Sequence, residues 1–238
     1  MFNGSSNTNV SRTVVTMQRS TKNWHIPSLP FVWSPLKVPT NGGDLPDRLP
    51  FSLGVEPTTG CVIQLSDEEV KSALSKAYLK GSVLSGLMDD EGIGRVYAED
   101  FLMFIEKSVP NNKLANTKVL EIGFGNGYLL KCLYEKGAEV LRIEPGNHGQ
   151  NGAERWQVPI IQDSFPSKSV SEKFDLVIAF AVLEHFENPV KFLSLIMASL
   201  SDDGIVIMAV PDEGPYIDSG DASTLFHEHW SYFAKVPC

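Results

Sequence analysis

Three glycines near the middle of the chain have a spacing that suits cofactor binding. Residues 121–127 read E-I-G-F-G-N-G, so glycine occurs at every second position. Glycine permits a sharp turn and, because it lacks a β-carbon, lets a ligand approach the backbone closely. Backbone N–H groups beside a helix N-terminus can hold an anionic group such as a carboxylate. We therefore predict a cofactor-binding turn made of Gly123, Phe124, Gly125, Asn126 and Gly127.

A carboxylate further along the chain belongs to the same predicted site. Residues 119–122 read as a buried strand and residues 128–136 as a helix that ends at Gly137. Strand, turn and helix form the first unit of a nucleotide-binding α/β domain. Glu144 ends a second apolar strand, about 20 residues beyond Gly123, where a carboxylate can accept both hydroxyls of a ribose. We predict that Glu144 and the adjacent Pro145 contact a nucleoside.

A second group of reactive side chains lies near the C-terminus. Residues 226–233 read F-H-E-H-W-S-Y-F, in which His227 and His229 flank Glu228. Imidazole titrates near neutral pH and can remove a proton from carbon or oxygen. The run follows the last predicted strand, so it should cross the mouth of the crevice at the strand ends. Its H-x-H spacing also suits a metal, but no third cluster of ligands accompanies it, and we predict no metal.

The spacing of the glycines distinguishes between two motifs that bind different cofactors. A dinucleotide fingerprint, G-x-G-x-x-G/A, would need a small residue where Tyr128 stands. The observed E-x-G-x-G-x-G pattern instead resembles motif I of the class I S-adenosylmethionine-dependent methyltransferases. Residues 174–189, F-D-L-V-I-A-F-A-V-L-E-H-F-E-N-P, resemble the fourth-strand motif of the same superfamily. The resemblance implies S-adenosyl-L-methionine as the cofactor.

The resemblance also implies roles for five further residues. Glu121 would bind the methionine amino group through water or orient the glycine turn. Asp163 would accept a hydrogen bond from the adenine amino group, unless it is a solvated loop residue. Phe180 and Ala181 would line the cofactor pocket. His185 would contact cofactor or substrate, or serve as a hydrogen-bonded structural histidine.

A narrower resemblance concerns the acceptor. Residues 226–233 resemble the Y-H-E-H-x-S-Y-F run of sugar C-methyltransferases, with Phe226 in place of the tyrosine. That resemblance implies deprotonation beside a keto group, with His229 as base, Glu228 orienting it and His227 nearby. Residues 60–65, G-C-V-I-Q-L, resemble the end of that family's N-terminal zinc module. Gly60 stands where a zinc-binding cysteine would be, so the module is degenerate and should hold no metal.

These patterns favour an S-adenosylmethionine-dependent methyltransferase that acts on a small molecule. The preferred acceptor is a keto-sugar-like compound methylated on carbon. An O- or N-methyltransferase of a small metabolite is an alternative. A non-catalytic protein that binds S-adenosylmethionine is a further alternative, in view of the missing zinc cysteines and Phe226.

Composition and net charge limit the kinds of partner that the chain is expected to bind. The chain has 238 residues, 42% of them hydrophobic, and a formal net charge of −9. That charge argues against a nucleic-acid partner, which calls for a basic face. The three cysteines are too few and too scattered for a disulfide framework. No apolar run approaches the roughly 20 residues of a membrane span, so we expect a cytoplasmic protein. The sequence leaves the oligomeric state open.

The order of predicted elements indicates an α/β fold. Five strands, at residues 119–123, 139–143, 158–161, 174–180 and 204–210, alternate with helices, which predicts a mostly parallel Rossmann-like sheet with helices on both faces. The C-terminal strands of a class I methyltransferase are apparently missing. We predict a disordered tail over 1–23, a loop-rich extension with one helix over 24–85, and a methyltransferase domain over 86–238. A helix over 88–107 should bury Ile93, Val96, Tyr97, Phe101, Phe104 and Ile105.

Overall fold

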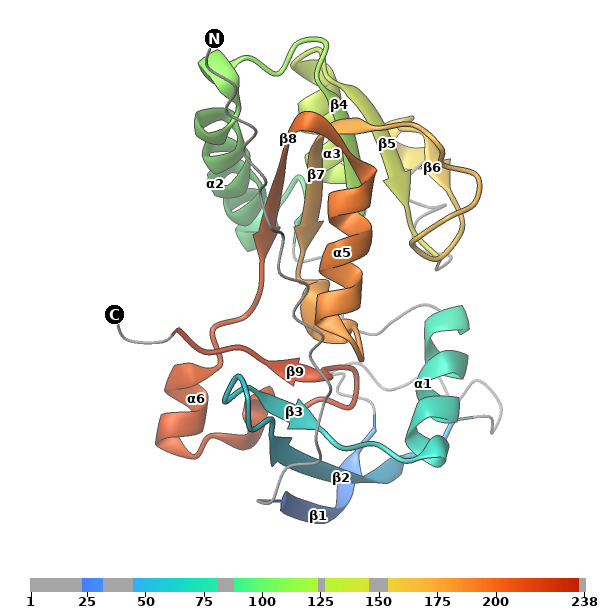
Figure 1. Cartoon of the computed structure of the whole chain (residues 1–238), viewed down its shortest axis with the longest axis vertical. Coiled ribbons are helices and arrows are strands. Elements are labelled where there is room, and N and C mark those ends of the chain that lie inside the picture. The colour runs from blue at the N-terminus through green and yellow to red at the C-terminus, as the bar shows by residue number, and fades with distance from the viewer. Residues whose placement is uncertain (1–22, 32–44, 81–87, 124–126, 146–153, 236–238) are drawn as a thin grey trace, which may run out of the picture.

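A five-stranded parallel sheet forms the centre of the molecule (Figure 1). The computed structural model describes residues 23–31, 45–80, 88–123, 127–145 and 154–235. The strand order is β6-β5-β4-β7-β8, and each neighbouring pair is parallel. The strands are β4 (Lys118–Ile122), β5 (Glu139–Ile143), β6 (Ile160–Ile161), β7 (Phe174–Phe180) and β8 (Leu200–Ala209). All five predicted strands are present, and the predicted α/β Rossmann-like fold class is confirmed.

Helices cover both faces of this sheet because its strands are apolar on both sides. The helices α2 (Gly92–Ser108) and α3 (Tyr128–Glu135) share one buried cluster with strand residues such as Val119 and Ile178. The helix α5 (Pro189–Ser199) packs on the other face through Phe192 and Ile196. Its first turn is capped by Asn188, whose Oδ1 accepts from Lys191 N at 2.9 Å. Within the described ranges, no helix is long and apolar enough to cross a membrane.

The buried face of α2 differs from the prediction. Ile93 is 69% exposed, and Val96, Tyr97 and Phe104 are also exposed, whereas Ala98 and Ile105 are buried. Small residues on the inner side, including Gly94, let the helix backbone approach its neighbours closely. The prediction is correct for Ile105 and wrong for the four exposed residues, Ile93, Val96, Tyr97 and Phe104.

A second, antiparallel sheet lies below the first in Figure 1. Its order is β1-β2-β3-β9, and its strands are β1 (Asn23–Pro30), β2 (Arg48–Val55), β3 (Val62–Gln64) and β9 (Ser231–Tyr232). Residues 24–85 were expected to be mostly loop because they are rich in proline, so these strands correct the prediction. The prolines Pro27 and Pro30 are accommodated because β1 is an edge strand with a register shift between Ile26 and Leu29. The predicted tail over 1–23 lies almost wholly outside the described residues.

The C-terminal part of the chain joins this second sheet. After β8 come α6 (Gly214–Ser219), the 3₁₀ turn η3 (Ala222–Thr224) and β9, which pairs antiparallel with β3. The chain therefore completes a sheet begun by its N-terminal residues instead of extending the parallel sheet. The helix α1 (Glu68–Lys80) also belongs to this part, and Asp67 caps it by accepting from Val70 N at 3.0 Å.

A buried ion pair joins the two central strands. Glu121 on β4 lies in register with Arg142 on β5, and Arg142 Nε is 3.7 Å from Glu121 Oε2. The arginine is 0% exposed, and its Nη2 donates to the carbonyl of Gly123 at 3.4 Å. Removing one member of a buried pair leaves the other charge desolvated and uncompensated. The pair therefore couples the stability of the sheet to the position of the glycine turn.

We predict that Arg142→Met lowers the free energy of unfolding by about 3–5 kcal/mol, because Glu121 is then buried without its counter-charge. Urea denaturation measures this change. Lys118→Met on the neighbouring strand β4 is the matched control, since Lys118 forms an exposed pair with Glu172 at 3.3 Å and its loss should cost less than about 1 kcal/mol. Equal losses in the two variants would contradict the role given to the buried pair.

Candidate active site

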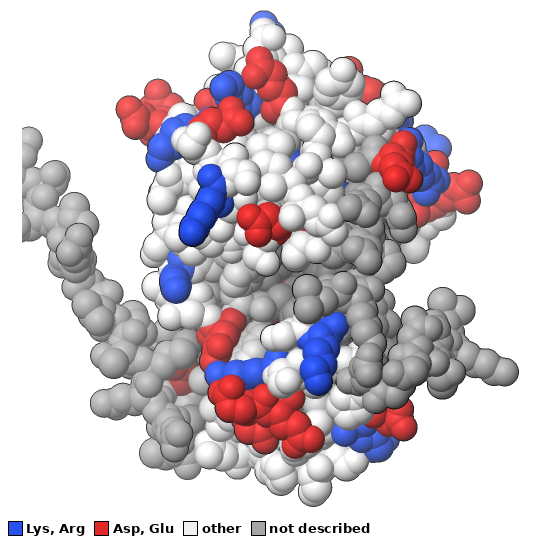
Figure 2. All heavy atoms as spheres, turned by 90° about the vertical axis from the view of Figure 1, so that its right-hand side faces the viewer, with Lys and Arg blue, Asp and Glu red and all other residues white. Residues whose placement is uncertain are grey.

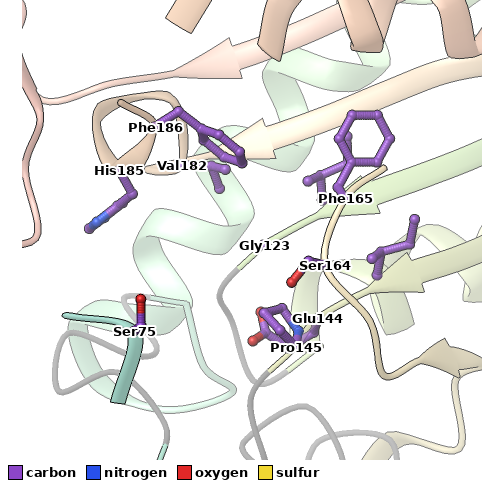
Figure 3. Close-up of a pocket in the computed structure, with 11 residues that line it drawn as sticks. Ser75, Gly123, Glu144, Pro145, Ser164, Phe165, Val182, His185 and Phe186 are labelled. Carbon is purple, nitrogen blue, oxygen red and sulfur yellow. The ribbon is translucent and has the colours of Figure 1, made fainter. Parts of the chain in front are cut away.

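A pocket of about 450 Å³ opens where β4, β5 and β7 end (Figure 3). Carboxyl ends of parallel strands are the usual ligand sites of open α/β sheets. The pocket reaches from the parallel sheet to α1, which contributes Ser75. Its walls are mainly apolar and contain a few polar groups. The lining residues are Ser75, Ile122, Gly123, Ile143, Glu144, Pro145, Ser164, Phe165, Val182, His185 and Phe186.

Gly123 begins the turn at one side of this pocket. Its φ of +96° is unfavourable for a residue with a side chain. A β-carbon on Gly123 would also lie 2.3 Å from Cγ2 of Val182, which is itself part of the wall. Only glycine therefore fits here. Gly127, with φ of +84°, immediately precedes α3, and the predicted Phe124, Gly125 and Asn126 lie outside the described residues.

Glu144 and Pro145 line the pocket beside Gly123, whose N–H donates to the carbonyl of Ile143, the residue before Glu144, at 3.1 Å (Figure 3). Glu144 directly follows β5, is 0% exposed, and its backbone N–H donates to the carbonyl of Ile161 at 3.1 Å. A buried carboxylate beside the apolar side chains of Ile143 and Phe165 combines a strong hydrogen-bond acceptor with surfaces suited to a planar ring. The residues present therefore fit a nucleoside cofactor.

Glu121 does not line the pocket. It pairs with Arg142, which in turn binds the carbonyl of Gly123, so the arrangement favours the loop-orienting alternative. Burial raises the pKa of the Glu121 carboxyl, and Arg142 opposes this effect. The sequence analysis missed Arg142, although a lone arginine in an apolar strand is a signal for a buried ion pair.

Three other predicted pocket residues point elsewhere. Phe180 packs edge-on against Phe101 of α2, with ring centroids 5.0 Å apart. Ala181 has a left-handed backbone, and the next residue, Val182, lines the pocket. Asp163 is exposed and accepts a hydrogen bond from Ser164 N at 2.8 Å. The prediction for Phe180 and Ala181 was therefore displaced by one to two residues, and Ser164 and Phe165 line the wall beside Asp163.

His185 is the predicted histidine that lines the pocket. It ends the 3₁₀ turn η2 (Leu183–His185), and its Nδ1 lies at hydrogen-bond distance, 3.0 Å, from the carbonyl oxygen of Glu228. Because a carbonyl only accepts, Nδ1 carries the proton and the neutral ring has its lone pair on Nε2. Burial lowers the pKa of His185 to about 4.

His229 lies behind His185, with ring centroids 5.0 Å apart. Burial and the proximity of His185 lower the pKa of His229 to about 3. The predicted orienting carboxylate, Glu228, is next to His185 instead, with Oε2 4.0 Å from His185 Nδ1. The carboxylate beside His229 is Glu213, whose Oε1 is 3.7 Å from His229 Nδ1. Sequence analysis missed Glu213 because it stands alone in a loop, without a motif.

His227 is separated from this group. Its ring packs against Phe31 and Phe51, with centroid distances of 5.4 Å and 5.2 Å. Its Nε2 is 3.2 Å from the carbonyl oxygen of Pro50, and burial lowers its pKa. The H-E-H run is a turn, in which His229 N–H donates to the carbonyl of Phe226 at 3.0 Å. The turn sends the two histidines to different sides, so His227 belongs to the core of the second sheet and His229 approaches the pocket-lining His185.

Comparison with known proteins agrees with this geometry. A family described as a methyltransferase domain matches residues 93–236. Ubiquinone biosynthesis O-methyltransferase from Actinobacillus pleuropneumoniae is 29% identical over 110 residues, which cover 41% of this chain and 47% of that protein. The tRNA U34 carboxymethyltransferase of Pseudomonas aeruginosa is 27% identical over 131 residues, which cover 50% of this chain and 38% of that protein.

The chain thus spans less than half the length of these curated relatives. Among solved structures, magnesium protoporphyrin IX methyltransferase from Synechocystis PCC 6803, with bound SAH, is 16% identical with a TM-score of 0.47, covering 59% of this chain and 66% of that one. The match to the family extends over more than half of the chain. The chain belongs to the methyltransferase domain family.

Proposed function

We propose that this chain binds S-adenosylmethionine in the pocket at the ends of β4, β5 and β7 and transfers its methyl group to a small molecule. The observation that carries the proposal is the placement of Gly123 and the buried Glu144 side by side in the wall of one pocket, with His185 lining the same pocket. The glycine turn would hold the methionine end, and Glu144 would accept the ribose hydroxyls. When bound, the cofactor supplies the electrophilic methyl group, and the protein aligns the acceptor with it.

The preferred acceptor remains a keto-sugar-like compound methylated on carbon. Carbon must lose a proton before it can attack the methyl group, so this reaction needs an acid–base group near the acceptor. His185 and the adjacent His229 supply two neutral imidazoles, the form that accepts a proton. An O- or N-methyltransferase, in which the imidazoles only position the acceptor, is the second candidate and draws support from the named function of the ubiquinone-related relatives.

Charge supports a small acceptor over a nucleic acid, although one relative is named for tRNA. The formal net charge is −9. On the face drawn in Figure 2, Lys and Arg side chains are interspersed with Asp and Glu and do not form one continuous basic surface. A cytoplasmic location and a boundary near residue 86 between the N-terminal part and the methyltransferase domain are further parts of the proposal.

Gly123→Ala should weaken binding of S-adenosylhomocysteine, measured by calorimetry, by roughly 10-fold or more, the equivalent of about 1.4 kcal/mol. The new β-carbon would displace Val182 and deform the pocket. Gly60→Ala is the matched control, because Gly60 also has a positive φ, +71°, but a β-carbon there meets nothing within 4 Å. Unchanged affinity in a folded Gly123→Ala protein would remove this turn from the cofactor site.

Glu144→Gln keeps the size of the side chain but removes its charge. A hydrogen bond to a charged group contributes about 1.5–3 kcal/mol, so S-adenosylhomocysteine affinity should fall about 10- to 100-fold. Glu154→Gln is the control, because it removes the charge of an exposed carboxylate close to Glu144 in the sequence. It should bind S-adenosylhomocysteine as tightly as the wild type. Equal affinities for the two variants would exclude Glu144 as the ribose acceptor.

The acceptor chemistry is tested by exchange of the proton next to the keto group. With S-adenosylhomocysteine bound and a keto-sugar present, the wild-type protein should exchange that proton with deuterated solvent. His229→Ala should reduce exchange and turnover by about 10²–10⁴-fold, the usual contribution of acid–base catalysis. The exposed His25→Ala should retain both activities. A product methylated on oxygen or nitrogen, without exchange in the wild type, would refute carbon methylation and leave the methyltransferase assignment in place.

A further inference from the structure

A compact group of potential metal ligands lies behind the pocket wall. It consists of Glu184, His185 and His229, which we call the inner cluster. Their nearest ligand atoms all lie within 4.8 Å of one another. Glu184 and His185 come from η2, whereas His229 comes from the C-terminal segment, so only the folded chain assembles the group. The cysteines of the resembled zinc module play no part in it.

Glu184 is the unusual member. Its residue is 1% exposed, and in the described part of the chain neither carboxylate oxygen accepts a hydrogen bond from another residue. A buried carboxylate without donors pays a large desolvation cost unless a cation or a proton compensates it. Its Oε1 is 4.0 Å from Nε2 of His185, which is too long for a hydrogen bond.

The imidazole of His185 is oriented as metal-binding histidines usually are. In such sites the second ring nitrogen donates to a carbonyl or carboxylate, which fixes the tautomer and the ring orientation. Nδ1 of His185 is 3.0 Å from the carbonyl of Glu228, so its Nε2 lone pair is on the Glu184 side. Nδ1 of His229 is 3.7 Å from Oε1 of Glu213, which brings the carboxylate near the ring but is too long for a hydrogen bond. Glu213 is held in turn by the hydroxyl of Thr224.

The spacing within the inner cluster also suits a shared ion. Nitrogen and oxygen ligands of zinc lie about 2.0–2.2 Å from the metal, so two of them are separated by up to about 4 Å. Side-chain movements of less than about 1 Å would bring the three ligand atoms within bonding distance of one shared ion. We propose that Glu184, His185 and His229 bind one divalent transition-metal ion of the zinc and cobalt class, for which two imidazoles and a carboxylate are a suitable ligand set.

This site goes beyond the proposed methyl transfer, because ion binding requires neither cofactor nor acceptor. His185 connects the site to the pocket, since it lines the pocket and belongs to the inner cluster. With an ion present, the two imidazoles serve as ligands. A bound ion would polarise an oxygen atom that it coordinates. Any effect of the inner cluster on the acceptor proton would then come from the ion and not from free imidazoles.

The test uses the full chain after treatment with a chelator. Co²⁺ should bind with a stoichiometry of one and give the visible absorption of a low-coordinate site, and Zn²⁺ should displace it. Glu184→Gln and His229→Ala should abolish this spectrum. Glu213→Gln, which changes only the group behind His229, should lower Zn²⁺ affinity about 10- to 100-fold. The exposed His25→Ala controls for binding at surface imidazoles and should leave titration and spectrum unchanged.

Glu184→Gln keeps the proposal testable if His229→Ala fails to fold, because it preserves the shape of the side chain. Zn²⁺ should raise the thermal midpoint of the wild type by mass action but not that of Glu184→Gln. The proposal is overturned if the wild type binds no Co²⁺, or if Glu184→Gln binds it as tightly as the wild type. Neither result depends on methyl transfer, so failure of this inference is distinguishable from failure of the proposed function.

Discussion

The backbone hydrogen bond from Trp230 N–H to the carbonyl of Glu184, 2.7 Å long, is the contact on which the candidate site depends. It attaches the C-terminal segment to η2, the turn that follows the central strand β7. On its other side, the carbonyl of Trp230 accepts from Gln64 N at 2.9 Å. One residue thus connects the antiparallel sheet to the end of the parallel sheet. Without this connection, His229 would not lie against His185.

Burial then sets the chemistry of the groups that are brought together. His185, His229 and Glu184 are removed from water, which favours the neutral forms of all three. Glu144 is also buried, but it lies in the pocket wall, where a ligand can bind it. The two sides of the site are therefore different. One side has the carboxylate of Glu144 and apolar walls, and the other has the imidazole of His185, held by the carbonyl of Glu228.

The N-terminal residues contribute to the site, although their high proline content did not predict this. α1 places Ser75 in the pocket, and Lys71 of the same helix binds Glu187 at 2.7 Å. β3 pairs with β9 and so fixes the segment that carries His229. A proline-rich stretch can supply strands when its prolines fall at an edge or an irregular position, as they do in β1. This part of the chain is thus a structural component of the proposed active site.

The sequence by itself determined the parallel sheet, the glycine turn and the positions of Glu144 and His185, because each depends on local spacing within a strand–turn–helix unit. Such units repeat a geometry in which residues after a strand meet at one edge of the sheet. Only the tertiary structure decided which carboxylate accompanies which histidine. Glu213 and His229 are separated by a helix and a turn, and the turn closed between Phe226 and His229 sends His227 into another core. Long-range packing also decided the buried side of α2, which carries Gly94, Ala98 and Ile105.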